Sequence, residues 1–98
     1  MKKIIPYFVF AQLLFAQNST LSGFVRDKTN KDPLLGANVV LLGTTLGAAT
    51  DIDGQFAINN IPSGDYKVKV TYIGFKSYEA QITFSQNETI QQNFDLDP

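Results

Sequence analysis

Cysteine and histidine are both absent from the 98 residues of this chain. Without them the chain cannot supply the usual zinc ligands, a Ser-His-Asp triad or a catalytic thiol. The lack of cysteine also excludes the disulfides that commonly supplement the limited core of a small exported domain, and the lipid-modified cysteine of a bacterial lipoprotein. We therefore expect strand pairing and core packing to hold the fold, with no metal and no cofactor.

Positive charge is also scarce. The chain has 8 Lys and Arg against 9 Asp and Glu, a formal net charge of −1, and its lysines and Arg26 are scattered along the sequence. Nucleic-acid backbones are bound by concentrated basic surfaces. We therefore expect no nucleic-acid partner.

The carboxylates offer little for acid–base catalysis. Glu79 and Glu88 could pair with an aspartate, but both lie in polar strand or turn contexts, which are typical of ordinary exposed carboxylates. Because no nucleophile, base or metal set converges in the sequence, we predict that the chain is not an enzyme.

The first sixteen residues differ from the rest of the chain. Two leading lysines are followed by residues 4–15, which are apolar apart from Gln12, and by the small Ala16 just before a polar run. This is the layout of a secretory signal peptide. A membrane anchor is the alternative, but a spanning helix needs about 20 apolar residues, and this stretch is shorter and contains Pro6. We predict a signal peptide at residues 1–16, cleaved after Ala16.

The remaining domain, residues 17–98, consists of short runs in which apolar and polar residues alternate, separated by turn residues. This pattern is typical of an all-β sandwich and not of βαβ units, and no window of helical length has a 3.6-residue apolar stripe. We predict a seven-stranded antiparallel β-sandwich with almost no helix and no transmembrane segment. The predicted strands cover residues 21–27, 37–42, 46–50, 55–58, 66–72, 75–84 and 90–96.

The clearest alternation runs through residues 66–72. Tyr66 and Tyr72 share one face with the valines between them, while two lysines and a threonine take the other face, so this strand should bury one side only. These tyrosines, with Phe75 and Tyr78, could instead line a sugar-binding surface. Alternation favours packing for Tyr66 and Tyr72, because a buried tyrosine needs only one partner for its hydroxyl.

Two apolar residues fall on faces that we expect to be exposed. Phe24 lies on the side of its strand opposite Leu21, Gly23 and Val25, and Ile73 also falls on a face that should meet water. Exposed apolar side chains are natural points of attachment for a partner. Phe24 and Ile73 are therefore our candidate contact surface.

The strongest turn signal lies at residues 51–54, Asp-Ile-Asp-Gly. The aspartates can bond nearby backbone amides, and Gly54 can supply the positive φ that a tight hairpin demands. A calcium loop is the alternative, but the twelfth position counted from Asp51, where an EF-hand has a bidentate glutamate, is Pro62. We predict a structural hairpin turn and no metal.

Several segments together form a familiar series: GFVRD at 23–27, PLLGANV at 33–39, GTT at 43–45, TDIDGQF at 50–56, PSGDY at 62–66 and YIGF at 72–75. In order and spacing they resemble the carboxypeptidase-regulatory-like domain, a transthyretin-like Greek-key sandwich of seven strands. In particular they are similar to the version at the N-terminus of TonB-dependent outer-membrane receptors of Bacteroidetes and their relatives, including starch-utilisation transporters.

The resemblance implies a periplasmic domain that precedes a plug and a membrane barrel. Neither follows in this sequence, so we expect either a free-standing domain or a part of a longer receptor, associated with the periplasm or the outer membrane. Its expected function is that of a non-catalytic accessory module, which docks onto a plug, a barrel or another envelope protein by its surface or by adding an edge strand. The alternative is a stand-alone carbohydrate-binding or surface-adhesion module.

Overall fold

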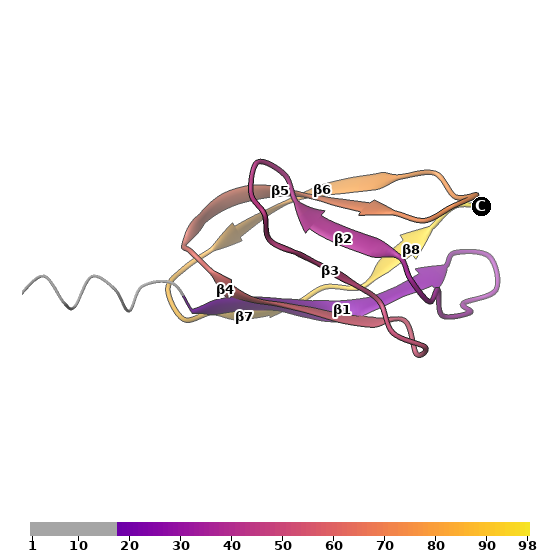
Figure 1. Ribbon diagram of the computed structural model, residues 1–98, viewed down its shortest axis with the longest axis horizontal. Coiled ribbons are helices and arrows are strands. Elements are labelled where there is room, and N and C mark those ends of the chain that lie inside the picture. The colour runs from indigo at the N-terminus through magenta and orange to yellow at the C-terminus, as the bar shows by residue number, and fades with distance from the viewer. Residues whose placement is uncertain (1–17) are drawn as a thin grey trace, which may run out of the picture.

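The computed structural model describes residues 18–98, and the predicted signal peptide at residues 1–16 lies outside them. The regular elements of the described part are all strands, arranged in two facing sheets (Figure 1). In the first sheet β1 (Ser19–Asp27) pairs with β4 (Gln55–Ile61) on one side and with β7 (Thr89–Gln91) and β8 (Phe94–Leu96) on the other.

The second sheet has the strand order β3 (Gly47–Ala49), β2 (Asn38–Leu41), β5 (Gly64–Thr71) and β6 (Tyr78–Phe84), with every neighbouring pair antiparallel. The all-β sandwich predicted from the sequence is confirmed. Residues 18–98 contain no helix long and apolar enough to cross a membrane.

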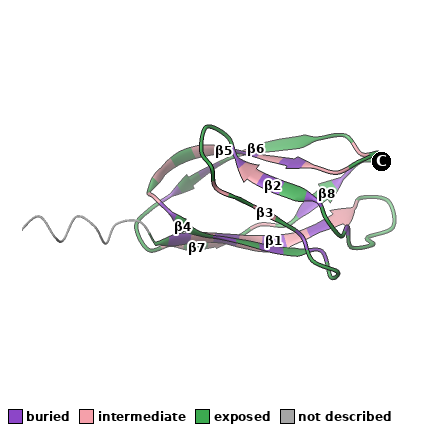
Figure 2. Cartoon of the chain, viewed as in Figure 1, coloured by how far each residue is buried: buried purple, intermediate pink, exposed green. Residues whose placement is uncertain are grey.

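The core lies between the two sheets, and the strands reach it with every second residue. Leu21, Gly23 and Val25 of β1 are buried, and so are Val68 and Val70 of β5, which confirms both predicted faces. Figure 2 shows the same alternation as buried stretches between exposed ones along single strands. Each large apolar side chain removed from water in this way contributes about 1.5–3 kcal/mol before chain entropy is subtracted.

The closing strand differs in two ways from the prediction of one antiparallel strand over residues 90–96. It is divided into β7 and β8, and both run parallel to β1. The division lies at residues 92–93, opposite Gly23, where a Cβ would overlap the carbonyl oxygen of Gln92. Instead of a backbone carbonyl, the Asn93 side chain accepts the hydrogen bond from the Phe24 amide, at 2.9 Å.

The turn at residues 51–54 is present, and Gly54 has the predicted positive φ, at 77°. Its amide donates to the Asp51 carbonyl at 2.9 Å, and the Asp51 carboxylate accepts the amides of Asp53 and Gln55, both at 2.9 Å. The prediction of a hairpin is wrong in one respect. Because β3 pairs with β2 and β4 pairs with β1, the turn carries the chain from one sheet to the other.

Candidate functional site

Ile73 is the most exposed large apolar residue in the described part of the chain, with 95% of its surface accessible. It stands on a tight turn in which the Phe75 amide donates to the Tyr72 carbonyl at 3.0 Å and Gly74 has a φ of 86°. The rings of Tyr72 and Phe75 meet edge to face, with their centroids 5.4 Å apart, and fix the base of this turn. The predicted exposure of Ile73 is confirmed.

Leu35 joins Ile73 at the same end of the sandwich, because β2 and β5 pair with Asn38 opposite Thr71. The Leu35 side chain is 56% exposed, whereas Leu34 before it is buried. The sequence prediction missed Leu35. Its signal was the pair of leucines, since consecutive residues of an extended segment point to opposite sides and only one of them can enter the core.

The loop that carries Leu35 is fixed by Thr50, one of the few buried polar residues. Its hydroxyl donates to the Leu34 carbonyl and accepts the Ala37 amide at 2.8 Å, while the Gly36 amide donates to the Thr50 carbonyl at 3.0 Å. Leu35 therefore projects from a well-anchored loop, and its exposure does not depend on local disorder.

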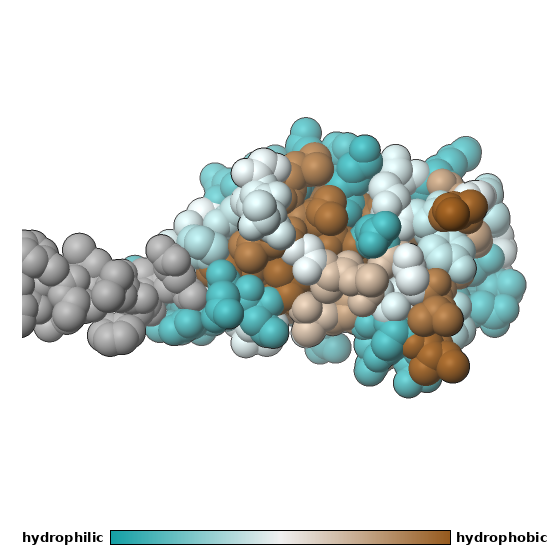
Figure 3. Space-filling model, viewed as in Figure 1, coloured by the Kyte–Doolittle hydropathy of each residue, from teal (hydrophilic) through white to brown (hydrophobic). Residues whose placement is uncertain are grey.

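Together these residues form what we call the loop-end patch, which surrounds an open hollow of about 620 Å³: Leu35, Gly36, Asn38, Thr71, Tyr72 and Ile73. Figure 3 shows isolated apolar atoms among hydrophilic ones at the end of the molecule where the chain reaches its last residue. The Lys76 amide donates to the Asp97 carbonyl at 2.8 Å, so the turn that carries Ile73 also binds the C-terminal residues.

Phe24, the second predicted contact residue, lies on the outer face of β1 but is only half-exposed. The guanidinium carbon of Arg26, two residues further along the same face, lies 5.8 Å from the centre of the Phe24 ring and covers part of it. Phe24 and Ile73 line separate hollows that have no residue in common. The structure therefore does not bring the two residues together into one patch.

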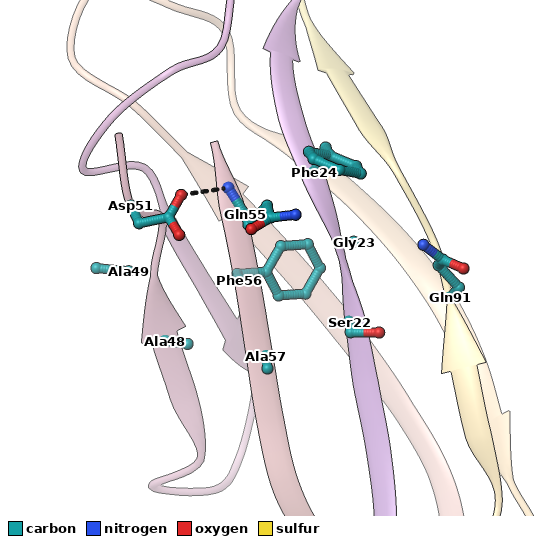
Figure 4. A pocket seen from close by; sticks show the side chains of 10 residues that line it. All are labelled: Ser22, Gly23, Phe24, Ala48, Ala49, Asp51, Gln55, Phe56, Ala57 and Gln91. Atoms are coloured by element: carbon teal, nitrogen blue, oxygen red, sulfur yellow. Dashed lines mark hydrogen bonds between the residues drawn. The ribbon is translucent and has the colours of Figure 1, made fainter. Parts of the chain in front are cut away.

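The hollow beside Phe24 has a volume of about 430 Å³ and opens on the outer face of the first sheet. Figure 4 shows side chains of its lining: Ser22 and Phe24 of β1, Gln55 and Ala57 of β4, Gln91 of β7, and Ala48 and Ala49 of β3. Most of these side chains are small or carry amides. The Asp51 carboxylate at its rim is committed to the backbone amides of its own turn.

The acidic residues singled out in the sequence take part in local structural bonds. Glu79 lies 3.9 Å from the Lys67 ammonium, and the Glu88 carboxylate accepts the Ser85 amide at 2.8 Å. Bonds from the hydroxyl and the amide of Thr29 lower the pKa of Asp27 below its ordinary value of 3.8. Within residues 18–98, no three side chains of the metal-binding types lie close enough together to hold an ion.

The tyrosines that could have formed a sugar-binding surface are used for packing. The Tyr66 hydroxyl donates to the Pro62 carbonyl at 2.7 Å, and its ring meets Phe84 edge to face at 5.9 Å. Tyr78 packs against Phe94 of the opposite sheet, with ring centroids 5.8 Å apart. The rings are therefore spread over separate packing contacts, and no flat aromatic platform results.

Comparison with known proteins gives a family for this chain. A family model described as "CarboxypepD_reg-like domain" matches residues 21–98. The TonB-dependent receptor SusC of Bacteroides thetaiotaomicron is 38% identical over 82 residues, which are 84% of this chain and 8% of that protein. The TonB-dependent transporter Oar of Myxococcus xanthus is 32% identical over 97 residues, or 92% of this chain and 9% of that protein. The chain thus spans less than a tenth of these relatives.

Solved structures show the same fold at low sequence identity. BcpA, the major pilin subunit of Bacillus cereus, superposes with a TM-score of 0.68 at 19% identity, over 83% of this chain and 30% of the pilin. A putative carbohydrate binding protein from Bacteroides uniformis gives a TM-score of 0.61 at 14% identity, over 82% of this chain and 41% of that one. At such identities the likeness establishes the sandwich architecture alone.

Proposed function

Because the chain belongs to the CarboxypepD_reg-like domain family, we propose that it works by contact, as an accessory domain of a TonB-dependent receptor in the bacterial envelope. The two receptors described above support this assignment, since each contains a segment similar to nearly all of the domain. The proposal places the domain on the periplasmic side of the outer membrane, exported by the signal peptide at residues 1–16. Its partner is the plug or the barrel of the receptor.

The observation that carries the proposal is the position of Ile73 and Leu35. Each exposes apolar surface on a hydrogen-bonded loop, and the turn that carries Ile73 also binds Asp97. Exposing an isoleucine to water brings no benefit to folding, whereas covering it on a partner recovers about 25 cal/mol for each Å² of apolar surface. The loop-end patch is therefore the surface we assign to docking. Phe24 is a second, weaker contact on the first sheet.

The proposal includes the absence of catalysis. In residues 18–98 the carboxylates with described partners bond to amides, hydroxyls, lysines or Arg26. General acid–base chemistry needs groups within hydrogen-bond reach of one reacting centre. The domain is accordingly assigned a binding role without a cofactor.

The test is affinity capture from envelope extracts of the source bacterium, with the full chain expressed in its cells as bait and captured proteins identified by mass spectrometry. We expect a TonB-dependent receptor to be retained by the wild-type chain and lost with Leu35→Asp and with Ile73→Asp. The matched control is Leu42→Asp, because Leu42 is 41% exposed but follows the opposite end of β2. Equal retention by all variants, or capture without any receptor, would contradict the proposal.

A carbohydrate-binding or adhesion module is the competing function. It predicts that the purified chain binds oligosaccharides on a glycan array in the absence of any other protein. Binding that is lost with Phe24→Ala but unaffected by Ile73→Asp would favour this competitor, since Phe24 is the less buried of the two phenylalanines that line the amide-rich hollow.

A further inference from the structure

The two sheets end in exposed strand edges, and proteins normally protect such edges against pairing with other chains by shortening, bending, covering or charging them. The edge strand β3 has three residues, and β7 and β8 have three each with a break between them. The edge strand β4 is longer, but it carries a bulge where its register against β1 shifts, with Asn60 at a positive φ of 59°. Each of these edges is thus protected.

The remaining edge, β6, is neither short nor bulged, and its one charged residue, Glu79, lies 3.9 Å from the Lys67 ammonium. It pairs with β5 over all seven of its residues without a register shift, and it contains neither lysine nor proline. In the described part of the chain no strand pairs with its other side. About half of its backbone amides and carbonyls therefore have no partner strand along an edge about 20 Å long, which is a template for another strand.

From this difference we propose that β6 is an interface between two copies of this chain, in which the two β6 strands pair antiparallel about a two-fold axis at Gln81. The paired strands would join the two second sheets into one continuous sheet. Neither Leu35 nor Ile73 is part of this interface, so evidence for or against it is independent of the proposed receptor contact.

The register follows from symmetry and from the alternation of faces. In an antiparallel pair of identical strands, inward residues must lie opposite inward residues, so the axis passes through a residue and not between two. Gln81 is the middle residue of Tyr78–Phe84, and only an axis there pairs all seven residues. An axis at either neighbouring residue leaves two residues of each strand without a partner.

The side chains of β6 suit this register on both faces. On the inner face, Tyr78 would lie opposite Phe84 of the second copy. This contact would cover part of Tyr78, which is 45% exposed in the single chain. On the outer face, Glu79 would lie opposite Thr83, and Gln81 opposite itself. No like charges oppose each other, and the one carboxylate of the strand already lies 3.9 Å from Lys67.

The absence of cysteine makes the register directly testable by cross-linking. Residues directly opposite in an antiparallel pair have Cα atoms about 4.5–5.5 Å apart, within the range that a disulfide spans. With diamide as the oxidant, we expect Gln81→Cys to form a covalent dimer much faster than Gln55→Cys. Gln55 is the matched control, because it is an exposed glutamine on the bulged edge strand β4.

Self-association of the purified chain gives the second readout. Sedimentation equilibrium should show the wild type moving from monomer to dimer mass with concentration. Gln81→Lys places two ammonium groups opposite each other and should weaken the dimer about tenfold or more at low salt, while Gln55→Lys leaves it unchanged. Circular dichroism should show that both variants remain folded, since both glutamines are exposed.

A wild-type chain that stays monomeric at every soluble concentration would overturn the proposal. So would equal cross-linking rates for Gln81→Cys and Gln55→Cys. If Gln81→Cys cross-links only to a different protein in envelope extracts, the edge has another occupant and the assignment to a second copy is wrong.

Discussion

The carbonyl oxygen of Gln92 occupies the space that a side chain at residue 23 would need, so Gly23 and Gln92 fit together only because glycine has no Cβ. At this point the closing strand divides into β7 and β8, and Asn93 supplies the acceptor for the Phe24 amide. The contact between Phe24 and Asn93, 69 positions apart, thus helps to set how the closing strands β7 and β8 pair with β1.

Gly23→Ala should therefore destabilise the domain strongly. The new methyl group meets backbone, which cannot swing away as a flexible side chain would, and overpacking of this kind costs about 1–3 kcal/mol. Urea denaturation followed by circular dichroism measures the change. Ser22→Ala, one residue away on the outer face of β1, should lie within about 0.5 kcal/mol of the wild type. Equal effects of the two substitutions would show that the close approach at Gly23 is absent.

The turn at Gly54 allows a similar comparison between two glycines. Both Gly54 and Gly43 have positive φ, at 77° and 83°, but a Cβ at Gly54 would lie 2.7 Å from the Val25 carbonyl oxygen, whereas one at Gly43 meets open space. Gly43→Ala should lower the free energy of unfolding by about 1 kcal/mol through backbone strain alone, and Gly54→Ala should lower it clearly more. Gly54→Val should be the most destabilising of the three, because β-branched residues are badly strained at this φ.

Calcium provides a separate check on the same turn. The Asp51 carboxylate already accepts two backbone amides, so added calcium should leave the melting temperature of the wild type unchanged. Asp53→Asn should cost little stability, because these side-chain bonds of the turn are accepted by Asp51 and not by Asp53. A calcium-dependent rise of several degrees in a thermal melt would restore the interpretation of residues 51–54 as an ion site.

The Thr50 side chain should contribute more to the stability of the fold than its small size suggests. Thr50→Val keeps the shape of the side chain but leaves the Ala37 amide and the Leu34 carbonyl without their partner in a buried place, at a cost of about 1–3 kcal/mol. Thr50→Ser keeps the hydroxyl and should lose less stability than Thr50→Val in the same denaturation experiment. If valine proved as stable as threonine, the anchoring of the Leu35 loop would have to come from other contacts.

The carboxyl group of Asp27 should titrate below its ordinary pKa of 3.8, because the hydroxyl and the amide of Thr29 both donate to its charged form. With a folded-state pKa below the unfolded one, Asp27 stabilises the fold above pH 3.8, and this contribution is lost as the pH falls through the lowered folded-state value. Carbon NMR of the carboxyl group measures the pKa. Thr29→Ala should raise it towards 3.8, while Thr45→Ala should not move it.

Much of the sandwich follows from local pattern. The alternation in residues 66–72 and around Val25 predicts which side chains enter the core, because period-two burial is a property of the strand itself. Gly54 is predictable for a similar reason, since the turn chemistry is contained in four consecutive residues. The exposure of Ile73 follows from the same alternation next to the chain reversal at Gly74.

Apart from the exposure of Leu35, which has a local signal in the pair of leucines, most features that escaped prediction depend on contacts between distant segments. The division at Gln92 requires knowing that Gly23 lies beneath it, and the anchoring role of Thr50 requires knowing that residues 34–37 pass over it. The partial covering of Phe24 by Arg26 is an intermediate case. The two side chains share one face of β1, so their contact could have been anticipated from their spacing.

The central claim, that the loop-end patch docks the domain onto a TonB-dependent receptor, is tested most directly by photo-crosslinking in the living envelope. A photo-reactive phenylalanine analogue replaces Ile73 in the full chain, and a second strain carries it at the exposed Ser63 of the loop between β4 and β5. The account predicts that the probe at position 73 forms an adduct containing peptides of a receptor plug or barrel, and that the probe at position 63 does not. Adducts of equal yield from both positions, or none from position 73, would contradict it.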